Sequence, residues 1–280
     1  MKRLRRLSGR RSSRRSEARY LLDGPVLLAE ALECGARIEG VYAEPGAPAD
    51  LLEAVTARGV PLQPVAQGAL RKVLDLAAPQ AVVAVVVMEP VGFEELCAGA
   101  IGSGAPLLAL VGIQDPGNAG TLVRVAEAAG CAGVAFTEGS VDPWNPKAVR
   151  ASAGSVLRVP LAVDVPTGEL LGATRDRGLD AVATVTEGGR PPELTELAGA
   201  SVLLVGSEAH GLPEELLAVV TRRVAIPMAG RVESLNAAVS GALVAFEAAR
   251  QRRGAEPVRP EGGSVGQNAR GDLRPTAENT

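Results

Sequence analysis

Hydrophobic residues follow two periods along this chain. Short apolar runs of strand length alternate with longer segments in which apolar residues recur every three or four positions, as in amphipathic helices. The stretch "YLLDGPVLLAEALECG" predicts a short strand, a turn at Asp23-Gly24-Pro25 and a helix that ends at Gly35. Strands are then expected at 38–44 and 80–89, and helices at 49–59 and 68–77. Residues 20–89 therefore predict a small α/β domain.

The second half of the chain repeats the strand-helix alternation. Pro and Gly residues at both ends of 90–106 predict a linker. Strands are expected at 107–112, 133–138, 180–187 and 201–206, with a helix at 119–130 and a last helix at 234–253. Such alternation predicts a parallel sheet within an α/β domain over 107–253. Residues 254–280 are almost without apolar side chains and predict a disordered tail.

Charge is distributed unevenly. Residues 1–19 carry nine Lys or Arg and a single acid, Glu17, whereas the remainder carries 20 basic and 31 acidic residues. A basic arm over 1–19 predicts a polyanionic partner that is bound through its phosphates. The whole chain has only six aromatic residues, which disfavours base stacking as the main mode of RNA recognition.

Three loops that follow predicted strands carry the candidate chemistry. They are "IQDPGNAGTLVR", "SEAHGLPEE" and the segment "SLNAAVSGALVAFE" after "RRVAIPMAGRVE". Each contains glycine and leads toward a helix, and ligands of open α/β sheets bind at the carboxyl ends of strands. The three loops are therefore expected to meet at one pocket. No Cys or His cluster predicts a metal site.

These motifs, in this order, resemble the three signature motifs of the SpoU/TrmH family of the SPOUT class. The quoted segments are "DPGNAGTLVRVAEAAG", "LLVGSEAHGLPEEL" and "VAIPMAGRVESLNAAVSGALVAFEA", with "NPKAVRASAGS" between the first two. The resemblance implies an S-adenosylmethionine-dependent RNA ribose 2′-O-methyltransferase. It also implies a homodimer whose catalytic domain is tied in a deep trefoil knot. The opening residues resemble the ribosomal-protein-like substrate-binding domain, expected over 20–89, that often precedes this domain.

The resemblance assigns roles residue by residue. Arg124 would grip the RNA phosphate and stabilise the forming alkoxide, with Asn118 orienting it or capping the helix. Glu208 would hold the catalytic geometry, Ser234 would position the substrate or Arg124, and Asn236 would fix the cofactor loop. Gly117, Gly120, Gly206 and Gly211 would let the backbone approach a ligand or cross another chain segment. The residues expected at the cofactor are Thr184, Val185, Gly206, Ser207, Gly211, Ile226, Met228, Ser234, Leu235 and Asn236.

RNA contacts are expected from the basic residues of the arm and of one polar segment. They are Arg5, Arg6, Arg10, Arg11, Arg14, Arg15, Lys147 and Arg150. Arginines of this kind strengthen binding without selecting a sequence. Ribosomal RNA is favoured over transfer RNA, because the chain carries a substrate-binding domain in addition to the catalytic one.

Two alternatives remain open. The chain could be a non-catalytic RNA-binding module of the same fold, such as a ribosome-assembly factor. A nicotinamide-dependent enzyme is disfavoured because its glycine fingerprint is missing. Three widely spaced cysteines indicate a reducing compartment, and we expect the cytoplasm, although an Arg- and Ser-rich start is also typical of organelle transit peptides.

Overall fold

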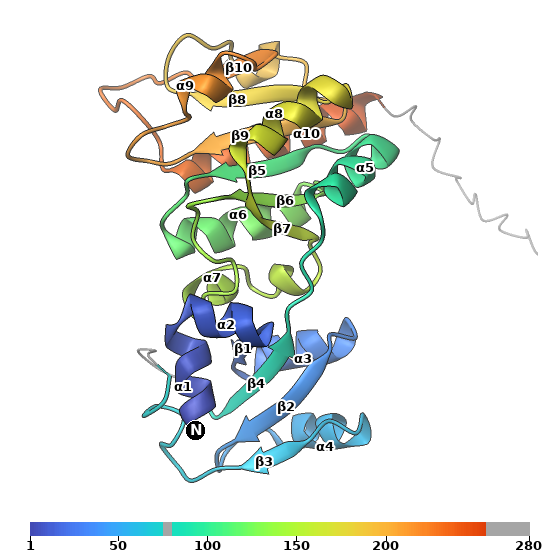
Figure 1. The fold of residues 1–280 in the computed structure, drawn as a ribbon, viewed down its shortest axis with the longest axis vertical. Helices are drawn as coiled ribbons and strands as arrows, with labels where there is room; N and C mark the ends of the chain where they lie inside the picture. The colour runs from blue at the N-terminus through green and yellow to red at the C-terminus, as the bar shows by residue number, and fades with distance from the viewer. Residues whose placement is uncertain (75–79, 256–280) are drawn as a thin grey trace, which may run out of the picture.

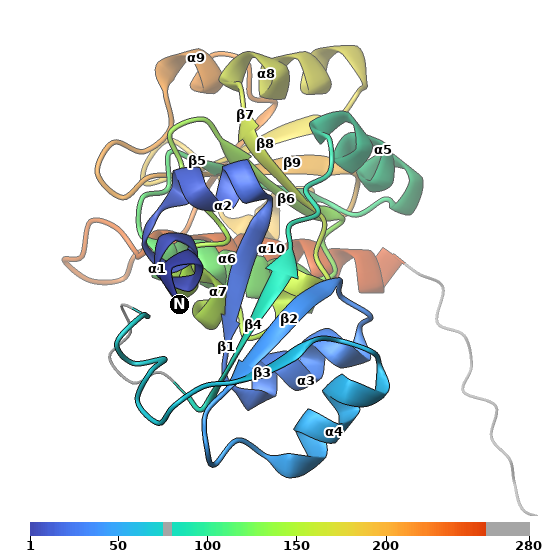
Figure 2. The same cartoon turned by 60° about the horizontal axis from the view of Figure 1, so that its bottom comes forward.

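The computed structural model describes residues 1–74 and 80–255, which form two sheets stacked along the long axis of the molecule (Figure 1). The smaller sheet has four strands in the order β1-β4-β2-β3, and the larger has six in the order β10-β8-β9-β5-β6-β7. Figure 2 shows the N-terminal sheet from a second direction, with α3 and α4 lying along one of its faces. The α/β class expected from the sequence is confirmed for both parts.

The N-terminal sheet is mixed. Strand β4 runs antiparallel to both of its neighbours, while β2 and β3 are parallel. Because β4 is apolar throughout, it can be covered on both faces, as its buried pattern shows. The elements are β1 (Arg19–Asp23), α3 (Pro25–Glu33), β2 (Ile38–Ala43), α4 (Ala49–Ala57), β3 (Leu62–Pro64) and β4 (Val82–Val87).

Residues 2–17 form two helices that pack onto this sheet and do not extend from it as an arm. Helix α1 (Lys2–Gly9) is amphipathic, and Leu4 and Leu7 are fully buried against Leu21, Val83 and Val85. Helix α2 (Arg11–Glu17) follows directly. Residues 1–19 are strongly basic, as counted from the sequence, but they do not form a free arm. Two leucines spaced three residues apart give α1 an apolar stripe, and this stripe holds the helix on the sheet.

The C-terminal sheet is parallel throughout. Its strand order reverses between β5 and β9, which is the position where ligands bind in open α/β sheets. Its strands are β5 (Leu107–Val111), β6 (Gly133–Thr137), β7 (Leu161–Val165), β8 (Asp180–Val185), β9 (Ser201–Gly206) and β10 (Arg222–Ala225). Its helices are α5 (Phe93–Ser103), α6 (Pro116–Ala128), α7 (Pro146–Ala151), α8 (Thr167–Asp176), α9 (Glu214–Leu217) and α10 (Ala237–Ala255).

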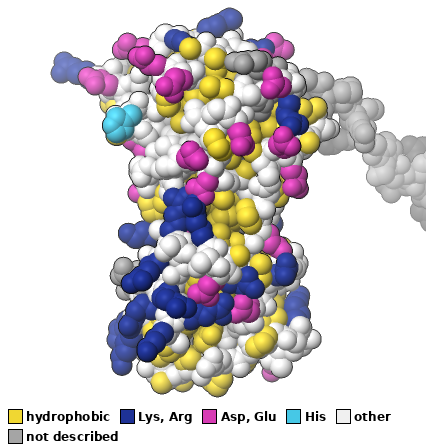
Figure 3. Space-filling view, viewed as in Figure 1, with side chains coloured by type: hydrophobic (Ala, Val, Ile, Leu, Met, Phe, Trp, Pro, Cys, Tyr) yellow, Lys and Arg dark blue, Asp and Glu magenta, His cyan; other side chains and the backbone are white. Residues whose placement is uncertain are grey.

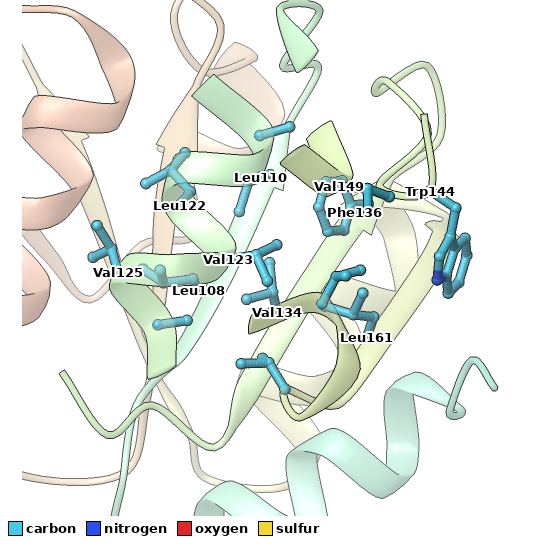
Figure 4. Close-up of a cluster of buried hydrophobic side chains, with 14 of the residues drawn as sticks. Leu108, Leu110, Leu122, Val123, Val125, Val134, Phe136, Trp144, Val149 and Leu161 are labelled. Carbon is cyan, nitrogen blue, oxygen red and sulfur yellow. The ribbon is translucent and has the colours of Figure 1, made fainter. Parts of the chain in front are cut away.

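Helices cover both faces of the C-terminal sheet. Leu108 and Leu110 of β5 point to the side of α6, whereas Leu107 and Ala109 join the cluster that includes α5 and α8. Figure 4 shows the first of these clusters, where Leu122 and Val123 of α6 lie near Leu108 and Leu110. This cluster continues into the N-terminal sheet, where Tyr20 packs near Trp144 with ring centroids 6.4 Å apart.

Several predicted elements differ from those observed. Residues 90–106, expected as a linker, contain α5, whose residues Phe93, Leu96, Cys97 and Ala100 are buried at helical spacing. Strands β3 and β7 were not predicted. Residues 68–74 form turns where a helix was expected, and 75–77 lie outside the described residues. The tail from 256 onward also lies outside them. Within the described ranges, no helix is long and apolar enough to cross a bilayer.

Candidate functional site

A cavity of about 480 Å³ lies at the carboxyl ends of β8, β9 and β10. Nine of the ten residues expected at the cofactor line it; the tenth, Asn236, lies between the lining residues Leu235 and Ala237. The nine are Thr184, Val185, Gly206, Ser207, Gly211, Ile226, Met228, Ser234 and Leu235. The volume lies in the range of about 300–1,000 Å³ that small-molecule sites occupy.

The cavity walls combine apolar and acidic groups. Apolar lining comes from Val185 at the end of β8, from Leu212 and Leu217 around α9, and from the segment 226–235 that follows β10. Three carboxylates also line the cavity, at Glu187, Glu208 and Glu233. Such a lining suits a ligand with a flat apolar part and a positively charged part. Within the described residues, no group of three or more His, Cys, Asp or Glu could hold a metal ion.

Gly206 brings two chain segments together beside the cavity. A Cβ added there would lie 2.4 Å from the carbonyl carbon of Gly211 and 2.8 Å from the amide nitrogen of Leu212. No side chain fits in that gap, so the end of β9 can touch the loop that returns over it only at glycine. Gly211 itself adopts φ +64°, in the left-handed region. These glycines therefore permit a close chain approach.

Three polar side chains from the three predicted loops form one hydrogen-bonded network. The Asn118 side-chain amide donates to the carboxylate of Glu208. Its carbonyl oxygen accepts from Asn236 Nδ2 at 2.9 Å. The network joins the start of α6, the loop after β9 and the start of α10, so the loops meet as expected.

The cap of α6 differs from the one expected. Asp115 caps α6, because its Oδ1 accepts from the backbone N–H of Asn118 at 2.8 Å, so the expected capping role of Asn118 is wrong. The signal was present, since an Asp directly before Pro116 marks a helix start. Asn236 caps α10 by accepting from the N–H groups of Ala238 and Val239.

Arg124 is separate from this network. It is exposed on α6 and does not line the cavity. Gly120, on the same helix, serves packing: a Cβ there would lie 2.2 Å from the carbonyl oxygen of Ala148 in α7. The expectation that Gly120 admits a ligand is replaced by close contact between α6 and α7.

The basic residues expected at RNA fall into two groups. Arg14 is buried, with a side chain 2% exposed, and its Nε lies 2.7 Å from Asp142 Oδ2. Arg11 and Arg15 both pair with Asp164 of β7. These three arginines pair with residues around the C-terminal sheet. Arg14 is out of reach of a phosphate in this structure, whereas the side chain of Arg15 is 46% exposed.

The remaining basic residues are exposed. Arg5, Arg6, Arg10 and Lys147 lie at the surface, and Arg150 is 46% exposed although it pairs with Asp23 at 2.7 Å. Figure 3 shows Lys and Arg side chains gathered over the N-terminal part of the molecule.

Two further basic residues that the sequence analysis did not single out lie beside this group. Arg71 and Lys72 are exposed, and Arg5 Nη2 donates to the carbonyl of Lys72 at 3.0 Å. Their turn is held by the buried carboxylate of Glu44, which accepts from the N–H groups of Gly68 and Leu70. No sequence pattern indicated this, because Glu44 lies more than twenty residues before the turn.

Comparison with known proteins identifies two family matches. Residues 105–246 match the model of the SpoU rRNA Methylase family, and residues 1–84 match an MRM3-like substrate binding domain. Together they cover the C-terminal sheet and the N-terminal sheet as far as the first half of β4.

Individual relatives agree with these matches. The chain is 31% identical over 206 residues to the 23S rRNA (guanosine-2′-O-)-methyltransferase RlmB of Ralstonia nicotianae, covering 72% of this chain and 82% of that protein. It is 39% identical over 145 residues to an uncharacterized tRNA/rRNA methyltransferase of Synechocystis; that match spans 52% of this chain and only about half, 53%, of that relative's length. An AdoMet-bound rRNA methyltransferase from Sinorhizobium meliloti superposes with a TM-score of 0.79 at 30% identity, over 89% of this chain and 94% of that one.

Proposed function

This chain belongs to the SpoU rRNA methylase family, and we propose that it is an S-adenosylmethionine-dependent RNA methyltransferase acting on a ribose 2′-hydroxyl of ribosomal RNA. The observation that carries the proposal is the meeting of three loops: Glu208 and Asn236 are both hydrogen-bonded to Asn118, beside the cavity at the ends of β8, β9 and β10. In this proposal the C-terminal sheet with its helices, α5 included, is the catalytic domain, and the N-terminal sheet with α1 and α2 is the RNA-binding domain.

The lining of the cavity fits S-adenosylmethionine. Apolar side chains such as Ile226, Met228 and Leu235 suit the adenine, and the carboxylates of Glu187 and Glu233 suit the positive charges of the methionine part. When bound, this cofactor supplies a methyl group on a sulfonium, so the transfer needs no metal. The protein's part is to hold the hydroxyl in line with that methyl group and to keep water away.

The hydroxyl proton must leave as the new bond to oxygen forms. Arg124 is a poor base because a guanidinium stays protonated. We assign it the role of gripping an RNA phosphate and stabilising the forming oxyanion. The proton then passes to the RNA phosphate, either directly or relayed by the hydroxyl of Ser234, which lines the cavity.

Because Arg124 does not line the cavity of its own chain, we propose that it acts in the partner's site of a homodimer. Helix α10, which packs against α6, supports this with an exposed apolar stripe: Val239, Leu243 and Phe246 are each 46–47% exposed. Their spacing of four and three residues puts them on one face of the helix. We also propose that the C-terminal part is threaded as a deep trefoil knot, for which the backbone contact at Gly206 is supporting evidence.

We propose that RNA lies across the exposed basic residues of the N-terminal half. Arg5, Arg6 and Arg10 form one end of this surface and Lys147 and Arg150 the other. Arg71 and Lys72 extend it. Phosphate contacts of this kind make binding salt-dependent and leave sequence selection to other groups.

Two alternatives are kept. The substrate could be transfer RNA, or the protein could be a non-catalytic ribosome-assembly factor. The complete Asn118–Glu208–Asn236 network favours an enzyme, since a binding module would not need it. The cytoplasm is the proposed compartment, in line with the free thiols of Cys34, Cys97 and Cys131.

The test is methyl transfer from labelled S-adenosylmethionine to unmodified ribosomal and transfer RNA, followed by digestion to nucleosides. We expect label on a ribose 2′-oxygen in ribosomal RNA. Arg124→Ala should abolish it, whereas Arg177→Ala, an exposed arginine of the same domain paired with Glu94, should leave it unchanged. Label on a base would overturn the chemistry, and label on transfer RNA alone would reassign the substrate. RNA binding without transfer to free RNA or to ribosomal particles would favour the assembly factor.

A further inference from the structure

The buried arginine of α2 contacts the catalytic domain. Arg14 Nε lies 2.7 Å from Asp142 Oδ2, and the two side chains are 2% and 6% exposed. Arg14 Nη1 donates to the carbonyls of Leu7 and Ser8 at 2.7 and 3.1 Å. The guanidinium of Arg14 therefore joins the end of α1 to Asp142, which lies 128 positions after Arg14 in the chain.

Asp142 belongs to the segment 137–145, which connects β6 to α7. Its second oxygen accepts from the N–H of Trp144 at 3.0 Å, so the carboxylate shapes this segment as well as binding Arg14. Trp144 is buried against Tyr20 of β1. One carboxylate thus ties the segment to both the helices and the sheet of the N-terminal part.

A second contact holds the same segment. Arg11 donates to the carbonyl of Ser140 at 2.9 Å and to Asp164 Oδ1 at 2.8 Å, and Arg15 also pairs with Asp164. Asp164 has φ +54°, an uncommon value for a residue other than glycine. It lies within an irregularity in the pairing of β6 with β7, between the partner residues Ala162 and Val165. The left-handed backbone thus occurs at the residue whose carboxylate binds both Arg11 and Arg15.

The segment 137–145 in turn holds the first motif loop. The N–H of Val141 donates to the carbonyl of Ile113 at 2.8 Å, and the N–H of Gly112 donates to Thr137 Oγ1 at 3.1 Å. Gln114 Nε2 donates to the carbonyl of Gly139 at 2.5 Å. Asp115, the cap of α6, comes next in the chain, and Asn118 lies in the first turn of that helix.

A continuous chain of contacts therefore runs from α2 to the candidate active site. It passes from Arg14 and Arg11 to the segment 137–145, from there to 112–115, and then to Asn118. We propose that Arg14 and Asp142 are a positioning pair for methyl transfer. Their contact holds the segment 137–145 in place. The same contact thereby has two effects: it docks the N-terminal part on the catalytic domain, and it places Asn118 against Glu208 and Asn236. This inference rests on the proposed function and adds two residues to it.

A buried ion pair suits this role better than an apolar contact would. Apolar side chains of similar size can slide over one another, whereas a guanidinium with three fixed acceptors has one favourable geometry. Breaking the pair by removing one charge leaves the other buried without a partner, so the segment has to rearrange. The consequence should appear at the active site.

The experiment uses the full-length protein and two variants that each remove one charge of the pair: Asp142→Asn, which keeps the side-chain shape, and Arg14→Gln, which is uncharged and shorter. The double variant is measured beside them. Arg37→Gln is the matched control, because Arg37 pairs with Glu89 on the exposed surface of the same N-terminal part, with side chains 69% and 58% exposed. Three quantities are measured below the unfolding temperature of every variant: single-turnover methyl transfer, the affinities for S-adenosylmethionine and RNA, and amide hydrogen exchange by segment.

We expect each single variant to slow single-turnover transfer at least tenfold, with both affinities changed less than threefold. Amide exchange should rise over 112–118 and 137–145 and stay unchanged in α4 and α10. The double variant should recover part of the rate, because it leaves no unpaired charge. Arg37→Gln should match the wild type in every measurement.

Three results would overturn the proposal. An unchanged transfer rate with faster amide exchange at 137–145 would make the pair purely structural. Amide exchange that rises uniformly over the protein, or a loss of transfer rate explained entirely by weaker RNA binding, would also overturn it. If the wild type itself transfers no methyl group, the proposed function fails. The exchange pattern over 112–118 then still decides whether Arg14 controls the first motif loop.

Discussion

Gly120 lies inside α6 with the backbone of α7 against its Cα, and replacing it by alanine tests the close packing of these helices. The added Cβ would lie 2.2 Å from the carbonyl oxygen of Ala148 and 2.7 Å from the Cβ of Ala151. Cβ contacts below 3.0 Å are essentially never seen, so the two helices must separate by at least about 0.8 Å. Backbone cannot turn aside as a flexible side chain can.

The expected cost follows from two opposing terms. Overpacking of a well-packed interior costs about 1–3 kcal/mol, and contact with backbone places this site near the upper end. Alanine gains about 1 kcal/mol over glycine in a helix interior. Gly120→Ala should therefore lower the free energy of unfolding by about 2 kcal/mol. With a urea dependence of about 3 kcal/mol per molar, the midpoint falls by roughly 0.7 M.

Urea unfolding followed by circular dichroism measures this shift, and Gly99→Ala is the matched control. Gly99 lies in α5, is exposed, and has nothing within 4 Å of an added Cβ. Its replacement should raise stability by about 0.5–1 kcal/mol through helix propensity alone. Equal stabilisation by both substitutions would refute the packing argument, because it would mean that α7 moves away from α6 at no cost.

Three further predictions concern acid stability, thiol reactivity and assembly. Hydrogen bonds from Arg3 hold the pKa of Glu39 at about 2, well below its usual 4.5. The folded state should therefore lose the stability that this carboxylate contributes as the pH falls from about 4.5 to 2. Glu39→Gln should flatten the pH dependence of the thermal midpoint over this pH range. Partial burial raises the pKa of Cys131 to about 12, so iodoacetamide at pH 8 should label the exposed Cys34 first, as mass spectrometry can verify. Equal labelling rates would contradict the raised pKa of Cys131. Leu243→Arg should give monomers in sedimentation and abolish methyl transfer; an active monomer would rule out a site shared between protomers.

Local sequence was sufficient for most strands and for the meeting of the three loops. Alternating strands and helices imply a parallel sheet, and loops after parallel strands share one edge. For this reason Asn118, Glu208 and Asn236 could be assigned to one site, although they lie up to 118 residues apart. The cavity lining was likewise anticipated from the motifs.

Only the tertiary structure decided the roles of the arginines. Arg5 and Arg14 look alike in a basic stretch of nineteen residues, yet one is exposed and the other is buried against Asp142. The pairing depends on a carboxylate 128 residues away, which no local pattern indicates. The same reason applies to Gly120, whose neighbour is the backbone of α7, and to Arg124, which lies outside the cavity of its own chain. Periodicity depends on near neighbours in the chain, whereas burial, pairing and close approach depend on which distant segments the fold brings together.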